Sequence, residues 1–275
     1  MKQKERFVLP GIVAVALILA ACGGDSGNNG TETEGTSSSS VDKTSSSSIG
    51  ALSSSLVVSS SSEKVAWDYL NPNITYGEIT DTRDGQTYKT VMIGTQTWMA
   101  ENLNYADSVS MTNLKDNSWC YNNSADSCTK YGRLYTWTGA MSIASSYQDA
   151  LATAVISAPH QGVCPTGWHI PTNAEWTILE NAVGGEDVAE TALKSTSGWN
   201  DDGNGTDAYG FSALPAGGRG GGLFFNAGNF VNFWSATESN DSRASLWVLY
   251  YSYGDFYCSS YGSKDYGFSV RCVKD

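Results

Sequence analysis

One stretch near the middle of the chain, residues 164–184, constrains the fold more than any other. Thr172 and Glu175 have the spacing of a capping box, in which each side chain satisfies a backbone donor left open at a helix start. Apolar residues then recur at the spacing of one helical face, and a glycine follows that suits a helix end. The stretch predicts a helix over about 173–183, docked on a sheet by its apolar face. The residues of that face are Trp176, Leu179 and Val183, and Gly184 is the glycine at the helix end.

The chain begins with a basic and then apolar segment that is typical of a secretory signal. The apolar run, residues 7–21, is shorter than the roughly 20 residues of a membrane-spanning helix, which is the alternative interpretation. It ends in Leu-Ala-Ala before Cys22, which resembles the bacterial lipobox. Residues 1–21 are therefore expected to be a lipoprotein signal peptide and Cys22 the lipidated first residue of the mature chain. This places the protein in the bacterial cell envelope, lipid-anchored at the outer membrane or cell surface.

The segment 22–63 joins this anchor to the rest of the chain and consists mainly of Ser, Gly, Asn and Thr. Such a composition cannot bury enough apolar area to offset chain entropy, so a disordered, Ser-rich tether is expected, with a reach on the order of 35 Å. The formal net charge is −12, and −14 without the signal peptide. An acidic protein is a poor partner for nucleic acid, whose binding depends on Lys and Arg. The membrane, through the lipid anchor, is one expected partner.

Residues 64–275 have the length and core-forming content of one domain. Three short strands are expected over 79–98, separated by turns at Asp84-Gly85 and Gly94-Thr95. A second short helix is expected over 134–141, and Gly217 to Gly222 is expected to be a loop with positive φ, because no phosphate-binding motif follows it. Further strands are expected over 232–237, 245–253 and 268–273. This order predicts an α+β fold with a mainly antiparallel sheet, two short helices and long loops.

Five cysteines remain after Cys22, and export makes disulfides plausible. Two bonds among five cysteines allow fifteen arrangements. We predict Cys120–Cys128, because the loop between them is short and polar, and Cys164–Cys272, because this bond would tie the helix approach to the last strand. Cys258 is then left as a free thiol or an intermolecular link.

Several motifs in order resemble the Fibrobacter succinogenes major paralogous domain over about residues 75–275. That family is similar to the C-type lectin fold and, more distantly, to formylglycine-generating enzymes. The resemblance implies a C-type-lectin-like fold in which the termini meet on a small sheet and long loops carry any ligand site. The motifs are 84–91, GTQTWMAENLN (94–104), 131–137, 164–176, YGFSALP (209–215), FWSATE (233–238) and GFSVRCVKD (267–275).

Two departures from these related folds bear on chemistry. Calcium-dependent lectins use a Trp-Asn-Asp strand motif, whereas Trp234 is followed here by Ser235 and Ala236. Formylglycine-generating enzymes carry two active cysteines five positions apart; five positions before Cys272 stands Gly267. A lectin-type calcium site and that enzyme chemistry are therefore not expected.

A different calcium site is conceivable in the loop 200–207, where carboxylates and amides alternate around glycines, as oxygen ligation of calcium requires. The candidate ligands are Asp201, Asp202, Asn204 and Asp207. A tight turn without metal has the same composition and is the alternative. No cofactor other than calcium is expected.

The C-terminal segment is unusually aromatic. On strands, alternate residues face opposite sides, so part of these rings are expected in the core and part at the surface. Exposed Tyr and Trp rings combine an apolar face with a polar edge, which suits sugar rings and protein interfaces. The candidate ligand-binding residues are Trp247, Tyr251, Tyr253, Tyr257 and Tyr261.

Residues for catalysis are few. Glu175, Glu180, Glu238 and Asp241 are the candidate carboxylates for glycoside hydrolysis, and His160 and His169 lack a nucleophile-elbow motif. We expect a non-enzymatic envelope lipoprotein whose domain binds an extracellular ligand, a glycan or polysaccharide. The alternative is a structural or assembly component that binds envelope proteins; an enzyme is a distant third.

Overall fold

The computed structural model describes residues 65–252 and 256–275. The expected signal peptide, Cys22, the whole of the expected tether and Tyr253 lie outside the described residues. Among the residues that the structure describes, no helix is both long and apolar enough to cross a membrane.

The first sheet joins the two ends of the described chain. The expected meander over 79–98 is present as three antiparallel strands. The last strand of the chain pairs with the third of them and with a short strand near the middle of the sequence. The strand order is β1 (Gly77–Thr80), β2 (Thr87–Ile93), β3 (Gln96–Met99), β13 (Val273–Lys274) and β6 (Trp168–His169).

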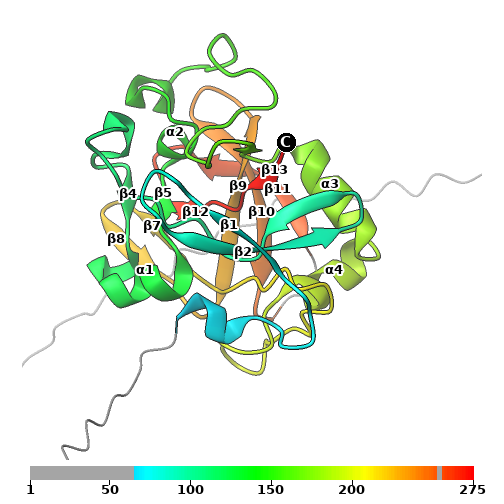
Figure 1. The fold of residues 1–275 in the computed structure, drawn as a ribbon. Coiled ribbons are helices and arrows are strands. Elements are labelled where there is room, and N and C mark those ends of the chain that lie inside the picture. The colour runs from blue at the N-terminus through cyan, green and yellow to red at the C-terminus, as the bar shows by residue number, and fades with distance from the viewer. Residues whose placement is uncertain (1–64, 253–255) are drawn as a thin grey trace, which may run out of the picture. The chain divides into compact units, whose positions relative to one another are not determined.

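The second sheet contains the two longest strands, which form an antiparallel pair at the centre of Figure 1. Its one parallel pairing joins β9 to β12. Its order is β11 (Tyr257–Ser263), β10 (Arg243–Tyr250), β9 (Phe230–Glu238), β12 (Phe268–Ser269), β5 (Leu134–Tyr135) and β4 (Ser118–Trp119). The fold is therefore α+β with mainly antiparallel sheets, as predicted.

Two expected elements differ in the structure. The strand expected over 268–273 is wrong as one strand, because β12 and β13 belong to different sheets. The glycine-rich loop is a hairpin, with strands β7 (Gly218–Gly220) and β8 (Leu223–Phe225) on either side of Gly221 and Gly222, both of which have positive φ.

The described chain contains four α-helices, two more than the sequence predicted. The helix expected over 134–141 is shorter, because its first two residues form β5 and pair with β4 and β12. The α-helices are α1 (Ala125–Tyr131), α2 (Trp137–Ala140), α3 (Asn173–Ala182) and α4 (Glu186–Leu193). The 3₁₀ helices are η1 (Ala66–Tyr69), η2 (Thr112–Leu114), η3 (Tyr121–Asn123) and η4 (Ser145–Gln148).

Helix α3 confirms the prediction for the central stretch. Thr172 Oγ1 accepts a hydrogen bond from the backbone N–H of Glu175, whose carboxylate accepts one from the backbone N–H of Thr172 in return. Trp176 is 0% exposed, and its ring centroid lies 4.7 Å from that of Trp98 and 5.4 Å from that of Phe233. Since these two rings come from the two sheets, Trp176 ties α3 to both.

Both disulfides form with the predicted pairing. Cys120–Cys128 closes a loop of sequence separation 8 around η3 and the start of α1. Cys164–Cys272 links positions 108 apart in sequence and holds the approach to β6 and α3 against the end of the chain. Cys258, on β11, is exposed and is the free cysteine of the described residues.

A buried arginine explains why β12 and β13 are separate. Arg271 is 1% exposed, and its guanidinium donates to the side-chain carbonyl of Asn102 and to the backbone carbonyls of Met99 and Phe211. Asn102 in turn donates to the backbone carbonyl of Tyr131 and to the hydroxyl of Ser269. A charged group buried in this way must be fully hydrogen-bonded, and meeting that demand interrupts the strand.

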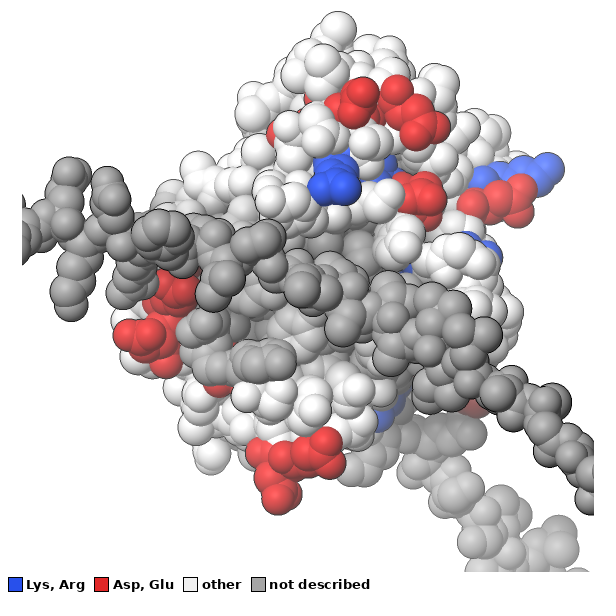
Figure 2. Space-filling model, turned by 180° about the vertical axis from the view of Figure 1, so that it is seen from behind, with Lys and Arg blue, Asp and Glu red and all other residues white. Residues whose placement is uncertain are grey.

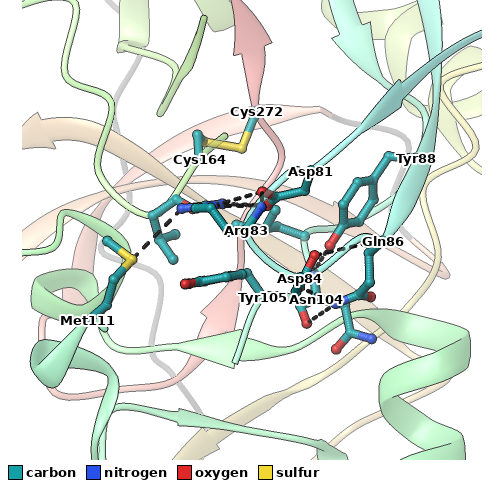
Figure 3. Close-up of polar contacts among 12 residues, drawn as sticks. Asp81, Arg83, Asp84, Gln86, Tyr88, Asn104, Tyr105, Met111, Cys164 and Cys272 are labelled. Carbon is teal, nitrogen blue, oxygen red and sulfur yellow. Dashed lines mark hydrogen bonds and ion pairs between the residues drawn. A yellow bond between two sulfur atoms is a disulfide. The ribbon is translucent and has the colours of Figure 1, made fainter. Parts of the chain in front are cut away.

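A second arginine anchors the turn between β1 and β2 to the body of the domain (Figure 3). Arg83 pairs with the buried carboxylate of Asp81, with Nη2 2.6 Å from Oδ2, and donates to the backbone carbonyl of Val163 beside the Cys164–Cys272 disulfide. Its guanidinium lies 3.9 Å from the ring centroid of Tyr105. The hairpin is thus held by polar contacts as well as by its strands.

Candidate functional site

A surface hollow of about 520 Å³ lies where β4, β7, η4 and the turn after β11 meet. Its wall is formed by Trp119 of β4 and Arg219 of β7, whose guanidinium lies 3.9 Å from the Trp119 ring centroid. Backbone hydrogen bonds in both directions between Arg219 and Gly267 fix the position of β7. A Cβ on residue 267 would lie 3.2 Å from Arg219 Cβ and 3.4 Å from the Trp119 ring, so glycine permits this close approach.

Amide and hydroxyl groups form the polar part of the hollow. Asn117 Oδ1 accepts hydrogen bonds from Thr136 Oγ1 at 3.0 Å and from Gln148 Nε2 at 3.2 Å. Thr136 is also the N-cap of α2, because its hydroxyl accepts from the backbone N–H of Gly139. The fold thus fixes these groups while leaving polar surface in the hollow, with Ser145 exposed beside them.

Four charged side chains line the hollow: Lys115, Asp116, Arg219 and Asp265. Within the described part of the chain, none of them is in an ion pair. The Arg219 Nε–H is buried and has no hydrogen-bond partner. Asp265 accepts a hydrogen bond from the hydroxyl of Ser263, and Arg219 stacks on Trp119, but none of the four charges is neutralised by an opposite charge among the described residues.

Charge elsewhere on the domain is scattered. On the face drawn in Figure 2, Asp and Glu lie in several separate groups, and few Lys and Arg are visible. The described residues of this face form no continuous basic patch of the kind that nucleic acid requires.

The structure does not gather the four candidate calcium ligands around one point. Asp201 and Asp202 are exposed and have positive φ, whereas Asp207 is buried and accepts hydrogen bonds from the backbone N–H and the hydroxyl of Ser212. Asn204 is exposed and accepts from a backbone N–H. Within the described ranges, no group of three or more His, Cys, Asp or Glu side chains could hold a metal ion. Calcium binding here stays a prediction.

The candidate aromatic residues are divided between core and surface. Trp247 is 3% exposed and packs on Trp176 and Phe256, so its ring is not available at the surface. Tyr251 is half-buried against the core, and Tyr257 and Tyr261 are exposed on the edge strand β11. None of the described members of this set lines the hollow.

Two of the candidate catalytic carboxylates, Glu175 and Glu238, have structural hydrogen bonds. Glu175 caps α3, and Glu238 accepts hydrogen bonds from the ammonium of Lys264 and the backbone N–H of Ala152. Glu180 is half-buried on α3 and Asp241 is exposed. His160 Nε2 lies 2.8 Å from the backbone carbonyl oxygen of Met141.

His169 lies between two carboxylates. Its Nε2 is 2.6 Å from Glu175 Oε1 and its Nδ1 is 2.7 Å from Asp275 Oδ1, so both ring nitrogens donate when the imidazole is protonated. Burial by itself lowers the pKa of His169, but the hydrogen bonds and charges of the two carboxylates raise it by more, so the net pKa is raised. The His169 side chain thus links β6, α3 and the chain end.

This arrangement predicts a pH-dependent stability. Because the folded pKa of His169 is raised, its contribution is complete below the ordinary value of about 6.5 and is lost as the pH rises through the folded pKa. H169Q should therefore lower the free energy of unfolding most at pH 6 and below, and progressively less at alkaline pH. Urea unfolding across this range measures it, with H160Q as the control.

The comparison with H169Q is needed because a second group changes stability in the same direction. Burial raises the pKa of Glu101 to about 7, so stability also falls as this carboxyl ionises. A wild-type-minus-H169Q difference that is constant with pH would contradict the role of His169.

Sequence reasoning missed the hollow. Trp119 stands beside Cys120 and Arg219 inside the glycine-rich loop, and neither position carries a local signal. Only the pairing of β7 with β8 and its bridge to Gly267 bring Arg219 to Trp119.

The fold and the hollow define a class of protein: a disulfide-bonded α+β domain of mainly antiparallel sheets with a recessed, polar surface site. Comparison with known families is more specific. The Fibrobacter succinogenes major domain family matches residues 91–274, about two thirds of the chain, and the protein belongs to this family. No curated protein and no solved structure matches the chain.

Proposed function

We propose that this protein is a lipid-anchored envelope protein whose non-catalytic, C-type-lectin-like domain binds an extracellular polysaccharide in the hollow between Trp119 and Asp265. Strands from both ends of the domain share one sheet, and irregular segments supply much of the site, which supports the lectin-like assignment. The Cys22 lipobox and the Ser-rich segment support display away from a membrane.

The single observation that carries the proposal is the composition of the hollow. Sugars are recognised by aromatic surface against their C–H faces and by planar polar groups that exchange hydrogen bonds with their hydroxyls. Trp119 supplies the aromatic surface, and Asn117 and Gln148 supply amide groups beside it. The volume of about 520 Å³ lies within the range of small-molecule sites.

Binding of polysaccharide should depend on Trp119. In a glycan array and a cellulose pull-down with the full chain, W119A is expected to lose about tenfold or more in affinity, because truncating a tryptophan that dominates a binding site costs about 2 kcal/mol or more. Y261A, which removes an exposed ring outside the hollow, is the matched control. Running each assay with calcium and with chelator also tests the loop 201–207.

Two results would count against this function. Absence of glycan binding under both conditions is one, and equal loss in W119A and Y261A is the other.

Lipid anchoring has its own test. Palmitate labelling of cells that express the full chain should give a labelled protein, and C22S should abolish the label, because the cysteine thiol is the group to which the diacylglyceryl lipid is attached. C258S retains Cys22 and should stay labelled, which makes it the control. Labelling that survives in C22S would exclude the proposed anchor.

A second candidate function is favoured by the exposed edge of the second sheet. Strand β11 presents Tyr257, Tyr261 and the free thiol of Cys258, and tyrosines are enriched at protein interfaces. If this edge binds another envelope protein, the chain is an assembly component. Y261A would then weaken that association while W119A would not.

A further inference from the structure

The guanidinium of Arg219 is held by the fold without being neutralised by it. Its face lies on Trp119 at 3.9 Å, and Phe224 lies 5.6 Å away on the neighbouring strand β8. Stacking uses the flat face of a guanidinium, whereas its N–H donors point outward in the plane. Trp119 therefore fixes the orientation of the fork while leaving its donors unoccupied.

The fold supplies no acceptor for those donors. Among the described residues, the Arg219 side chain has neither an ion pair nor a hydrogen bond, and its Nε–H is buried. By contrast, Arg83 and Arg271 each have several acceptors. A buried donor without an acceptor is unfavourable, so the stacking of Arg219 on Trp119 does not by itself explain why the Nε–H is buried without a partner.

Carboxylate is the ligand group that matches this donor set. A guanidinium fork and a carboxylate form two parallel hydrogen bonds, which are roughly twice as strong as neutral ones. Lys115, exposed at the rim and also without an ion pair, adds a second positive charge to the same hollow. A neutral sugar, which offers only hydroxyl groups, would require neither the guanidinium of Arg219 nor the ammonium of Lys115.

We propose that the hollow selects a hexuronic acid unit, which is a sugar ring that carries a carboxylate. The guanidinium of Arg219 binds this carboxylate. This rests on the proposed function, because it names the class of sugar bound at the same site. The amides of Asn117 and Gln148 meet the ring hydroxyls, while Asp265 and Asp116 lie at the rim and repel a second acidic group. The preferred ligand is thus a polysaccharide in which uronic acid is flanked by neutral sugar or is bound at a chain end.

Titration calorimetry of the full chain tests this with a neutral oligosaccharide that ends in one galacturonic acid unit and with the methyl ester of that unit, because the ester keeps the sugar ring and masks its carboxylate. The acid should bind about tenfold tighter than the ester, and its affinity should fall as NaCl rises from about 0.05 to 0.5 M. R219Q should reduce the affinity for the acid to that for the ester and leave the ester unchanged. R219K, which retains the charge but not the fork, should lie between them.

The matched control is R243Q, which removes the same charge from an exposed arginine that stacks on Tyr261 outside the hollow. D265N should strengthen binding of the acid alone. Thermal melts of each variant establish that it is folded.

The outcomes separate the two proposals. Equal affinity for acid and ester, or equal effects of R219Q and R243Q, would overturn uronate selectivity while leaving glycan binding intact. Absence of binding to these probes and to every neutral glycan would overturn the proposed function itself.

Discussion

K264M is expected to destabilise the domain by about 3–5 kcal/mol, one of the two largest effects that the structure predicts. Lys264 is 0% exposed, and the three N–H donors of its ammonium are shared among four acceptors: Glu238 Oε1 at 2.6 Å and the backbone carbonyl oxygens of Asp241, Ala150 and Tyr147 at 2.7, 2.9 and 3.1 Å. Removing the cation leaves a buried carboxylate and three carbonyls without their donor.

Urea unfolding of the full chain measures this loss. K115M is the matched control, because Lys115 is exposed and without an ion pair, and its effect should lie within about 0.5 kcal/mol. The double variant K264M/E238Q should recover part of the loss, since it also removes the uncompensated negative charge. A loss below about 1 kcal/mol in K264M would show that the ion pair and the carbonyls are hydrated in solution.

The two disulfides should contribute unequally. A cross-link restricts the unfolded chain more when the loop it closes is longer, so a separation of 108 is worth about 4–5 kcal/mol and a separation of 8 about 2–2.5 kcal/mol. We expect C164A/C272A to lower the urea midpoint about twice as much as C120A/C128A. Each pair serves as the control for the other, and C258A, which breaks no disulfide, should change little.

Equal losses in the two double variants would contradict this expectation. Adding reductant to the wild-type chain gives the combined loss without any substitution, so cavities left by alanine can be separated from the loop effect.

The motifs that identify the family are mostly explained by the fold. Asn102 and Arg271 form a buried hydrogen-bonded pair, Trp176 joins the two sheets, and Trp234 donates its indole N–H to the backbone carbonyl of Tyr135. Residues with these roles specify the fold of the domain and do not by themselves specify a ligand. The groups proposed to bind sugar, Trp119 and Arg219, lie outside those motifs.

The sequence alone determined the features that depend on neighbouring residues. The Thr172–Glu175 capping box and the turns of the first meander were all readable, because each involves positions a few residues apart. Cys120–Cys128 was predicted on the same ground, and Cys164–Cys272 followed from placing α3 near the end of the chain.

The tertiary structure alone decided the rest. The strand expected over 268–273 divides because Arg271 must reach buried acceptors that lie 169 and 60 positions away in sequence. Trp247 is buried because α3 covers it, although the strand pattern of the sequence did not show whether its side chain faces the core or the surface. The hollow brings Lys115 together with Arg219 and Asp265, and no local pattern encodes which strands become neighbours: that choice is made by the packing of the whole core.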